Sequence, residues 1–335
     1  MLCSKDLVKR AIEFRKPERV PYNFDSNRTP VTAERYGDDF EWVFSTPPGD
    51  NFPIALGNDR YRNEFGVVYH RPGATFGEAK EFPLADLSRV TSYSIPDFSH
   101  PARFAAMEEI VLNNPDKYIL GMFPHFLFQQ MLDLFGFDGL MVALLKERKA
   151  VDLIADRLTE SCLRMVESFA NRGADGMIAI EDLGLQDRLM IAPDLWREVF
   201  RPRMAAIVDA CHARNMHLFV HSCGGIQDVI EDFVAMRVDV LQIDQQDNMG
   251  IDELARRFAG RICFFCPVDI QTTLPAGSPA AIEAKAKHLM RAFGSRGGGF
   301  MAKTYPQPEA IRIPEENTRV MCEAFRTFGR YPFQF

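Results

Sequence analysis

The chain has 335 residues, 47% of them hydrophobic and 25% charged, which is enough apolar material for a large buried core. Its formal net charge of −7 at pH 7 gives it no basic surface for a phosphate backbone, so we expect no nucleic-acid partner. The start of the sequence has no apolar stretch of signal-peptide length, and no later run reaches the roughly 20 apolar residues of a membrane helix. We therefore expect a cytoplasmic protein with no membrane partner, and seven cysteines without a regular framework agree with a reducing compartment.

Short β-rich runs alternate with longer helical patterns along most of the chain. The runs that predict buried strands span residues 19–25, 118–124, 176–184, 217–225, 238–244, 261–269 and 298–305. Repeated βα units predict a parallel sheet covered by helices on both faces, and their number favours a closed (β/α)8 TIM-type barrel with one strand missed. An open doubly wound sheet is the alternative, weakened because no Gly-x-Gly-x-x-Gly follows a strand.

Residues 28–116 break this alternation. They are rich in proline, glycine and aromatic residues, as expected of an insertion after the first strand. In a barrel, such an insertion would cover the carboxyl-end mouth as a lid, and an elongated loop is the simpler alternative. We treat residues 1–335 as a single barrel domain that carries this insertion.

Polar residues gather where the predicted strands end. Because active sites of such barrels lie at the carboxyl ends of the strands, these side chains are the candidate functional groups. They are Asp25, Asn27, His125, Glu181, Asp182, His221, Cys223, Asp244, Gln246, Cys266, Asp269, Lys303 and Tyr305. Burying so many polar groups unpaired is costly, so we expect them to converge on water, a ligand or a metal.

The segment HLFVHSCGG (217–225) places His221 and Cys223 two positions apart, on one face of a strand. Both are zinc-ligand types, but zinc needs a third ligand, for which Cys266 and Glu181 are the candidates. The alternative is a hydrogen-bonded histidine beside a buried cysteine, with Cys266 as a small apolar residue.

Glu181 and Asp182 are adjacent, so only one of them can face the barrel interior. We expect one to act as acid, base or ligand, and the other to cap the following turn. His125 lies among aromatic residues, where it either assists catalysis or lines a pocket without chemistry. Phe123 and the phenylalanines near it could wall an aromatic substrate site, with core packing as the commoner explanation.

Several segments together resemble the uroporphyrinogen decarboxylase superfamily, especially its corrinoid-dependent methyltransferase branch. They are RVPYNFD, YRNEFGVV, IEDLGLQDRLMIAPDLWREVFRPRM, HLFVHSCGGIQDVIEDF, VDVLQI, CPVDIQTTLPAGSP and IPEENTRVMCEAF. The resemblance spans nearly the whole chain in order. It implies a (β/α)8 barrel with its active site at the carboxyl-end mouth.

The resemblance also implies a zinc site built from His-x-Cys and a third cysteine, or histidine, on the last barrel strand. His221 and Cys223 match the first two positions, whereas the third falls at Gln307, a poor zinc ligand. A variant site that uses Cys266 or Glu181, or a site without metal, therefore stays open.

The activity that this resemblance implies is methyl transfer from a small methyl ether, such as a methoxylated aromatic, or from an amine to a corrinoid. The corrinoid would be carried by a separate protein, because the chain lacks the cobalamin-binding Asp-x-His-x-x-Gly. Two further hypotheses are the reverse reaction, in which a thiol or folate is methylated, and a non-catalytic binding role. A symmetric homodimer is a base-rate expectation.

The main alternative is a metal-independent decarboxylase or lyase acting on a small cyclic or aromatic acid. True uroporphyrinogen decarboxylase is disfavoured because RVPYNFDSNRTP lacks the arginine-rich motif of that branch. In either case, we assign Glu181, Asp182, His125 and Tyr305 to catalysis, and Asp25, Asn27, Gln186, Gln307 and Phe123 to substrate binding.

Overall fold

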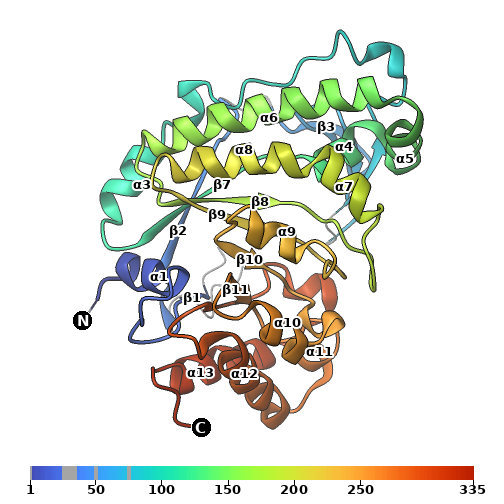
Figure 1. Ribbon diagram of the computed structural model, residues 1–335. Helices are drawn as coiled ribbons and strands as arrows, with labels where there is room; N and C mark the ends of the chain where they lie inside the picture. The colour runs from blue at the N-terminus through green and yellow to red at the C-terminus, as the bar shows by residue number, and fades with distance from the viewer. Residues whose placement is uncertain (1, 25–35, 49–51, 74–76) are drawn as a thin grey trace.

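The computed structural model describes residues 2–24, 36–48, 52–73 and 77–335, and its centre is a sheet of eight parallel strands (Figure 1). The strands are β1 (Tyr22–Asn23), β2 (Phe40–Phe44), β7 (Tyr118–Met122), β8 (Gly176–Ile180), β9 (His217–His221), β10 (Val240–Gln242), β11 (Cys263–Cys266) and β12 (Phe300–Lys303). They pair in the order β1-β12-β11-β10-β9-β8-β7-β2. Asp39 N donates to Tyr22 O over 3.0 Å, joining the two outermost strands, which confirms the predicted (β/α)8 barrel.

Helices surround the barrel. The α-helices are α1 (Ser4–Ile12), α3 (Met107–Asn113), α4 (Phe128–Phe135), α5 (Phe137–Lys146), α6 (Arg148–Ala170), α7 (Pro193–Val199), α8 (Arg201–His212), α9 (Ile230–Ala235), α10 (Ile251–Phe258), α11 (Thr273–Ala276), α12 (Pro279–Gly294) and α13 (Glu315–Phe328). The 3-10 helices are η1 (Leu87–Arg89), η2 (Pro101–Phe104), η3 (Gln246–Met249) and η4 (Pro308–Ile311). Across the described residues, no single helix is long and apolar enough to cross a membrane, and the pair α4–α5 passes that test only jointly, across a 107° bend.

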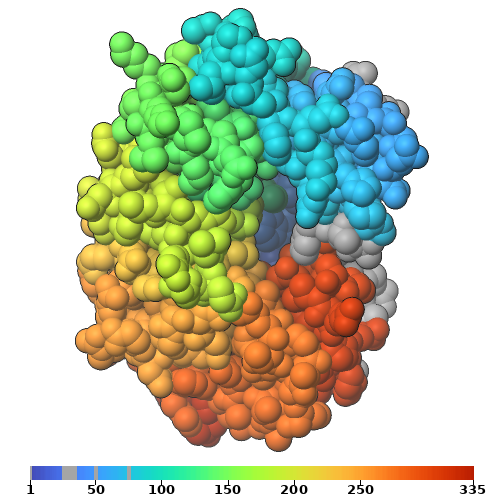
Figure 2. Space-filling view, turned by 90° about the vertical axis from the view of Figure 1, so that its right-hand side faces the viewer, coloured from blue at the N-terminus to red at the C-terminus, as the bar shows by residue number. Residues whose placement is uncertain are grey.

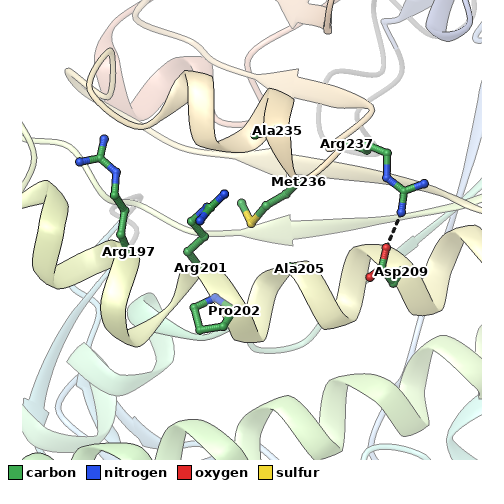
Figure 3. A pocket seen from close by; sticks show the side chains of 8 residues that line it. All are labelled: Arg197, Arg201, Pro202, Ala205, Asp209, Ala235, Met236 and Arg237. Carbon is green, nitrogen blue, oxygen red and sulfur yellow. Dashed lines mark hydrogen bonds and ion pairs between the residues drawn. The ribbon is translucent and has the colours of Figure 1, made fainter.

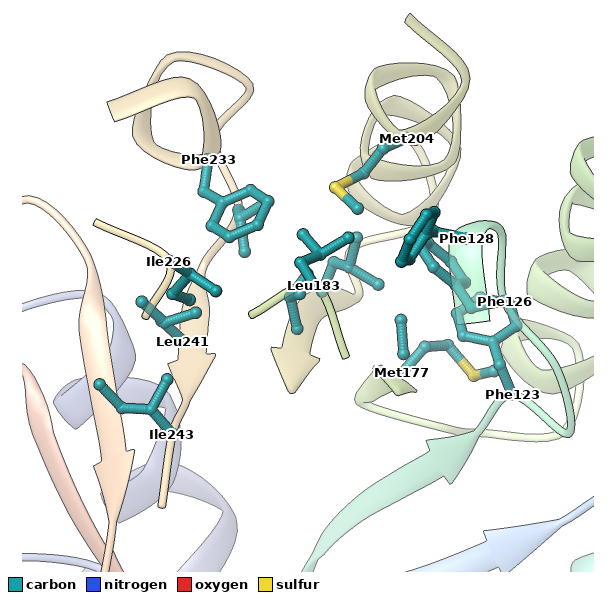
Figure 4. Close-up of a cluster of buried hydrophobic side chains, with 14 of the residues drawn as sticks. Phe123, Phe126, Phe128, Met177, Leu183, Met204, Ile226, Phe233, Leu241 and Ile243 are labelled. Carbon is teal, nitrogen blue, oxygen red and sulfur yellow. The ribbon is translucent and has the colours of Figure 1, made fainter. Parts of the chain in front are cut away.

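Alternate residues of each strand form two apolar cores, as the period of two requires. The inner core fills the barrel, where the Phe40 ring stacks on Phe265 at 5.4 Å and meets Tyr118 and Phe219 edge-on. The outer core lies between the strands and the helices, and Figure 4 shows part of it, including Phe123 and Met204. A residue's parity within its strand therefore decides whether it faces the barrel interior.

Helix α1 closes the amino end of the barrel. Its residues Val8, Ala11 and Ile12 belong to the same buried cluster as the inner core of the strands. Backbone bonds hold it across that end: Lys5 N donates to Asp116 O, before β7, and Gly299 N, before β12, donates to Ala11 O. The carboxyl end is thus the end at which a site can open.

The strand missing from the sequence prediction is β2, Phe40–Phe44, which lies inside the predicted 28–116 insertion. The prediction that the insertion follows the first strand was therefore wrong, because an antiparallel sheet follows the second. Its strands are β3 (Ile54–Gly57), β4 (Arg60–Arg62), β5 (Val68–His70) and β6 (Glu78–Glu81). The short β2 segment, FEWVF, stands between acidic and proline-rich stretches without a strong period of its own.

The antiparallel sheet lies beside the barrel mouth. The Tyr69 hydroxyl donates to Asp133 Oδ2 of α4 over 2.8 Å, and Leu84 N donates to Leu134 O. Because α4 follows the carboxyl end of β7, these bonds place the insertion at the end of the barrel that α1 does not close. Figure 2 shows a hollow on this face with the light-blue insertion on its rim and dark-blue N-terminal residues at its depth. A lid role for the insertion stays a prediction.

Candidate metal centre

Three side chains with metal-binding atoms meet at the barrel mouth. His221 ends β9, Cys223 follows it by two residues, and Asp182 follows β8 by two. Cys223 Sγ lies 3.4 Å from His221 Nε2, which lies 3.3 Å from Asp182 Oδ1. The three donor atoms lie within 4.8 Å of one another.

The spacing of these donors fits a zinc ion. With zinc–sulfur bonds of about 2.3 Å and zinc–nitrogen or zinc–oxygen bonds of about 2.0–2.1 Å, tetrahedral ligands lie about 3.3–3.6 Å apart. The Cys223–His221 and His221–Asp182 separations of 3.4 and 3.3 Å are within that range. Three protein ligands with a fourth position left for solvent or substrate is the pattern of catalytic rather than structural zinc.

A chain of hydrogen bonds orients the His221 ring. His221 Nδ1 lies 2.5 Å from Gln242 Oε1, and Gln242 Nε2 donates to Asp244 Oδ1 over 2.8 Å. Asp244 Oδ1 also accepts from Lys303 Nζ at 2.8 Å. Because the Gln242 amide nitrogen already donates to Asp244, its oxygen must accept the Nδ1 proton, which leaves the Nε2 lone pair aimed at Cys223 and Asp182.

Two glycines let the loops that carry the ligands approach closely. Gly224 has φ of +77°, and a Cβ on it would lie 2.2 Å from the Leu185 carbonyl oxygen. A Cβ on Gly225 would fall 2.7 Å from the Asp187 backbone. The glycines of HSCGG therefore bring the β9 loop against the β8 loop, which places Cys223 N 2.9 Å from Asp182 Oδ1.

The charges of the three groups depend on one another. Burial opposes the ionisation of Asp182, but hydrogen bonds from His221 and from the Cys223 backbone outweigh it and lower its pKa. Burial likewise opposes a charged His221, yet Asp182 and Cys223 raise its pKa well above the ordinary value. Burial raises the pKa of the Cys223 thiol, partly offset by His221. A metal ion here would replace protons, so its binding must compete with them.

Glu181 is fully buried and points away from this cluster. Its carboxylate accepts the backbone N–H groups of Phe128 at 2.9 Å and Gln129 at 3.2 Å, at the start of α4. Burial raises its pKa to about 8, against the lowering effect of these two bonds. Of the two adjacent carboxylates, Asp182 rather than Glu181 joins the cluster, and Glu181 caps the start of α4 instead of the turn that follows β8.

Cys266 is also separated from the His221 and Cys223 pair. Phe265 faces the barrel interior, so Cys266 has the opposite parity and lies in the outer core with Phe264. Of the residues described, only Asp182 supplies a third donor atom to the pair. The assignment of Cys266 as third ligand is corrected by this alternation of the strand.

His125 and Phe123 belong to the outer core. His125 Nε2 lies 3.1 Å from Ser161 Oγ, and the His125 ring packs between Phe65 and Phe98. Burial lowers the pKa of His125 to about 3, so the ring is neutral at pH 7. Phe123 is 2% exposed in the same layer (Figure 4). The structure therefore supports the packing alternative for both, in place of the catalytic and substrate-binding roles.

The other predicted residues spread around the mouth. Lys303 Nζ lies 5.9 Å from the ring centroid of Tyr305, and burial together with Asp244, Cys223 and Asp182 raises the pKa of that hydroxyl. Gln186 is exposed and exchanges two hydrogen bonds with Gln271. Gln307 directly precedes η4, and its buried Oε1 has no hydrogen-bond partner within the described ranges. Asp25 and Asn27 lie outside the described residues.

Sequence reasoning missed Gln242, which orients the histidine. Gln242 pairs with His221 in register and shares its face. A lone glutamine in an otherwise apolar strand was the available signal.

A second pocket lies on the outer surface, between α8 and α9 (Figure 3). Three arginines line it, but each is ion-paired: Arg197 and Arg201 with Asp232, and Arg237 with Asp209. Their charge is already balanced, and the pocket is separated from the barrel interior by the sheet. The mouth is the better candidate site.

Comparison with known proteins agrees with the fold. A family model described as uroporphyrinogen decarboxylase matches residues 120–328. A methyltransferase from Methanosarcina mazei superposes with a TM-score of 0.74 at 16% identity, over 98% of this chain and 99% of that one. A D-psicose 3-epimerase solved with D-fructose gives a TM-score of 0.49 at 8% identity, over 92% of this chain and 97% of its own. No curated protein sequence matches this chain. At these identities the structural likeness shows the fold alone.

Proposed function

This chain belongs to the uroporphyrinogen decarboxylase family, and from that premise we propose that it is a metal-assisted methyltransferase that demethylates a small methyl ether or amine. The methyl group would pass to a corrinoid carried by a separate protein. The observation that carries the proposal is the cluster of Asp182, His221 and Cys223 at the open end of the barrel. The likeness in fold to a methyltransferase supports it.

The three donors would hold zinc with one position left for the donor molecule. Bound zinc would supply Lewis acidity, which makes an ether oxygen or amine nitrogen a better leaving group. The chain's own residues hold this geometry: Gln242 fixes the tautomer of His221, while Asp244 and Lys303 fix Gln242. Tyr305, which lies near Asp244, Cys223 and Asp182, would orient the substrate.

For an ether donor, the atoms and electrons of the proposed methyl transfer balance. The carbon–oxygen bond breaks, its electron pair stays on oxygen, and that oxygen takes up one proton to give an alcohol or phenol. The Co(I) form of the corrinoid, a two-electron nucleophile, forms the new bond to the methyl carbon. No external oxidant or reductant is consumed in this step.

The charge of the mouth disfavours the decarboxylase alternative. Asp182 and Asp244 lie at the carboxyl ends of their strands, and Lys303, at the end of β12, is already paired with Asp244. Arg19, in the segment where that branch would need arginines, is bound to Asp39 through two bonds of 2.7 Å. A carboxylate substrate would meet acidic groups here.

The experiment is a methyl-transfer assay on the zinc-loaded chain with free cob(I)alamin as the probe acceptor and a set of methyl ethers and methylamines. We expect methylcobalamin formation that is lost on chelation, restored by zinc, and lost in His221→Ala. Release of carbon dioxide from small cyclic or aromatic acids, without any effect of zinc or cob(I)alamin, would instead establish the decarboxylase.

A further inference from the structure

Helix α5 presents an exposed apolar face. Three of the eight large hydrophobic side chains that are exposed among the described residues lie on it, Phe137, Val142 and Leu145, and Leu145 is 77% exposed. The opposite face packs into the outer core through Leu140 and Leu144. A helix that is apolar on both faces is normally buried on both. Figure 1 shows α5 at the margin of the molecule, so its outer face is a candidate interaction surface.

The charged residues of this face lie at its two ends. Asp138 is in the first turn of α5 and Lys146 in the last, and both are exposed. At about 100° per residue, both lie on the same side of the helix as Val142 and Leu145. Neither forms an ion pair with any residue of the described ranges. The outer face is therefore acidic at one end, apolar in the middle and basic at the other end.

Gly139 lies on the same side of the helix, and the packing of the chain itself does not require a glycine there. Its φ is outside the left-handed region, and a Cβ added to it would meet only Phe135 Cβ, at 3.8 Å, an ordinary contact. Glycine in a helix interior destabilises the helix relative to alanine. The position would be explained by a large side chain that packs over it from a partner.

We propose that the outer face of α5 binds the same face of a second copy of this chain, with the two helices antiparallel about a twofold axis at Val142. Asp138 precedes Val142 by four residues and Lys146 follows it by four, so Asp138 meets the partner's Lys146. Leu145 follows Val142 by three residues and packs over the partner's Gly139, which precedes it by three. Each contact occurs twice, as a twofold interface requires. The inference does not depend on the proposed function.

The composition of this face favours a second copy over a lipid surface. Helices that lie in a membrane interface are rich in lysine and arginine on their polar face. The outer face of α5 instead carries one acidic and one basic residue, which complement each other when the face meets itself. Two ten-residue helices bury less than the roughly 1,600 Å² of a typical specific interface. We therefore expect a weak dimer, with a dissociation constant in the micromolar range.

Sedimentation equilibrium of the full chain over a wide range of concentration tests the proposal. We expect the wild type to show a monomer–dimer equilibrium. Leu145→Glu should weaken dimerisation about tenfold or more, because it places a charge at the centre of the interface. Leu112→Glu is the matched control, since Leu112 of α3 is 79% exposed and should leave the equilibrium unchanged. Gly139→Gln should weaken dimerisation although it favours the helix.

Two further experiments test the antiparallel arrangement. Asp138→Lys and Lys146→Asp should each weaken dimerisation several-fold, and the double variant should restore it, because the pair is then reversed in sign. Val142→Cys should give a disulfide-linked dimer under mild oxidation, since the two Val142 positions meet on the axis. The wild type, whose cysteines are buried or half-buried, and Leu112→Cys should not.

A wild type that stays monomeric at every concentration would overturn the inference. So would a dimer that Leu145→Glu does not weaken and that Val142→Cys does not link, because such a dimer uses another surface. Co-sedimentation of a monomer with phosphatidylcholine vesicles, lost in Leu145→Glu, would assign the face to lipid and would equally contradict it.

Discussion

Asp182 decides whether the histidine and cysteine at the mouth make a metal site. We expect roughly one zinc per chain in the wild type, and a large loss in Asp182→Asn, since an amide oxygen is a weaker ligand than a carboxylate. Cys266→Ala, in the outer core, should retain its zinc. Elemental analysis after metal-replete growth measures both, and the reverse pattern would return Cys266 to the site.

Gln242 is a positioning residue whose effect should appear in metal affinity. Removing the partner of a metal-bound histidine typically costs 10–100-fold in affinity. We therefore expect Gln242→Leu to raise the zinc dissociation constant by about that factor in a chelator competition. Gln186→Leu is the matched control, because that glutamine contacts Gln271 on the rim and not the histidine. Unchanged affinity in Gln242→Leu would show that the His221 ring needs no such support.

At the scale of elements, His125 links the segment after β7 to α6 and makes stability depend on pH. Burial lowers its folded pKa to about 3, below the unfolded value of about 6.5. Between these values only the unfolded chain binds the proton, so this contribution is fully present above pH 6.5 and is lost as pH falls. Between pH 7 and pH 5 the His125 share of the loss is about 2 kcal/mol.

Urea unfolding of the wild type and His125→Gln at pH 7 and pH 5 tests this expectation. The wild type should lose more stability than the variant over that interval, because glutamine does not titrate. Equal losses in the two proteins would mean that the ring is protonated in the folded state or does not stay buried.

Strand parity explains what the sequence could predict of the site and what it could not. The period of two correctly placed His221 and Cys223 together, and predicted that one of the adjacent carboxylates would cap a turn. It could not choose between them, because that choice depends on the register of β8 against β9, where Ile180 pairs with His221. Register is fixed by pairing between distant segments, which no local pattern records.

At the scale of the whole molecule, the seven predicted strands were sufficient to predict a barrel. They did not predict the contact between β1 and β2 that closes it. Closure depends on Asp39, whose buried carboxylate accepts from Ser4 Oγ, the Tyr22 backbone and the Arg19 guanidinium. These partners come from two separate segments, helix α1 and residues 19–22. The sequence shows only an acidic residue before an unrecognised strand.

Asp39→Ala should therefore destabilise the fold by about 3 kcal/mol, because it leaves the half-buried Arg19 guanidinium and the buried Tyr22 N–H without their partner. Chemical denaturation gives the free energy of unfolding. Asp187→Ala, which removes only an exposed pair with Arg188, should stay within about 0.5 kcal/mol of the wild type. A similarly small effect at Asp39 would show that the barrel closes without this carboxylate.

Within the described residues, helix α1 closes the amino end of the barrel, which leaves the carboxyl-end mouth as the entrance to the site. Under the proposed function, a small donor would have to enter before the carrier protein covers that mouth, and its demethylated product would leave only after the carrier withdraws. Turnover would then follow a compulsory order, with the donor first. Steady-state rates should fall, rather than level off, when the carrier is raised far above the donor, because the carrier would occupy the entrance of an empty barrel.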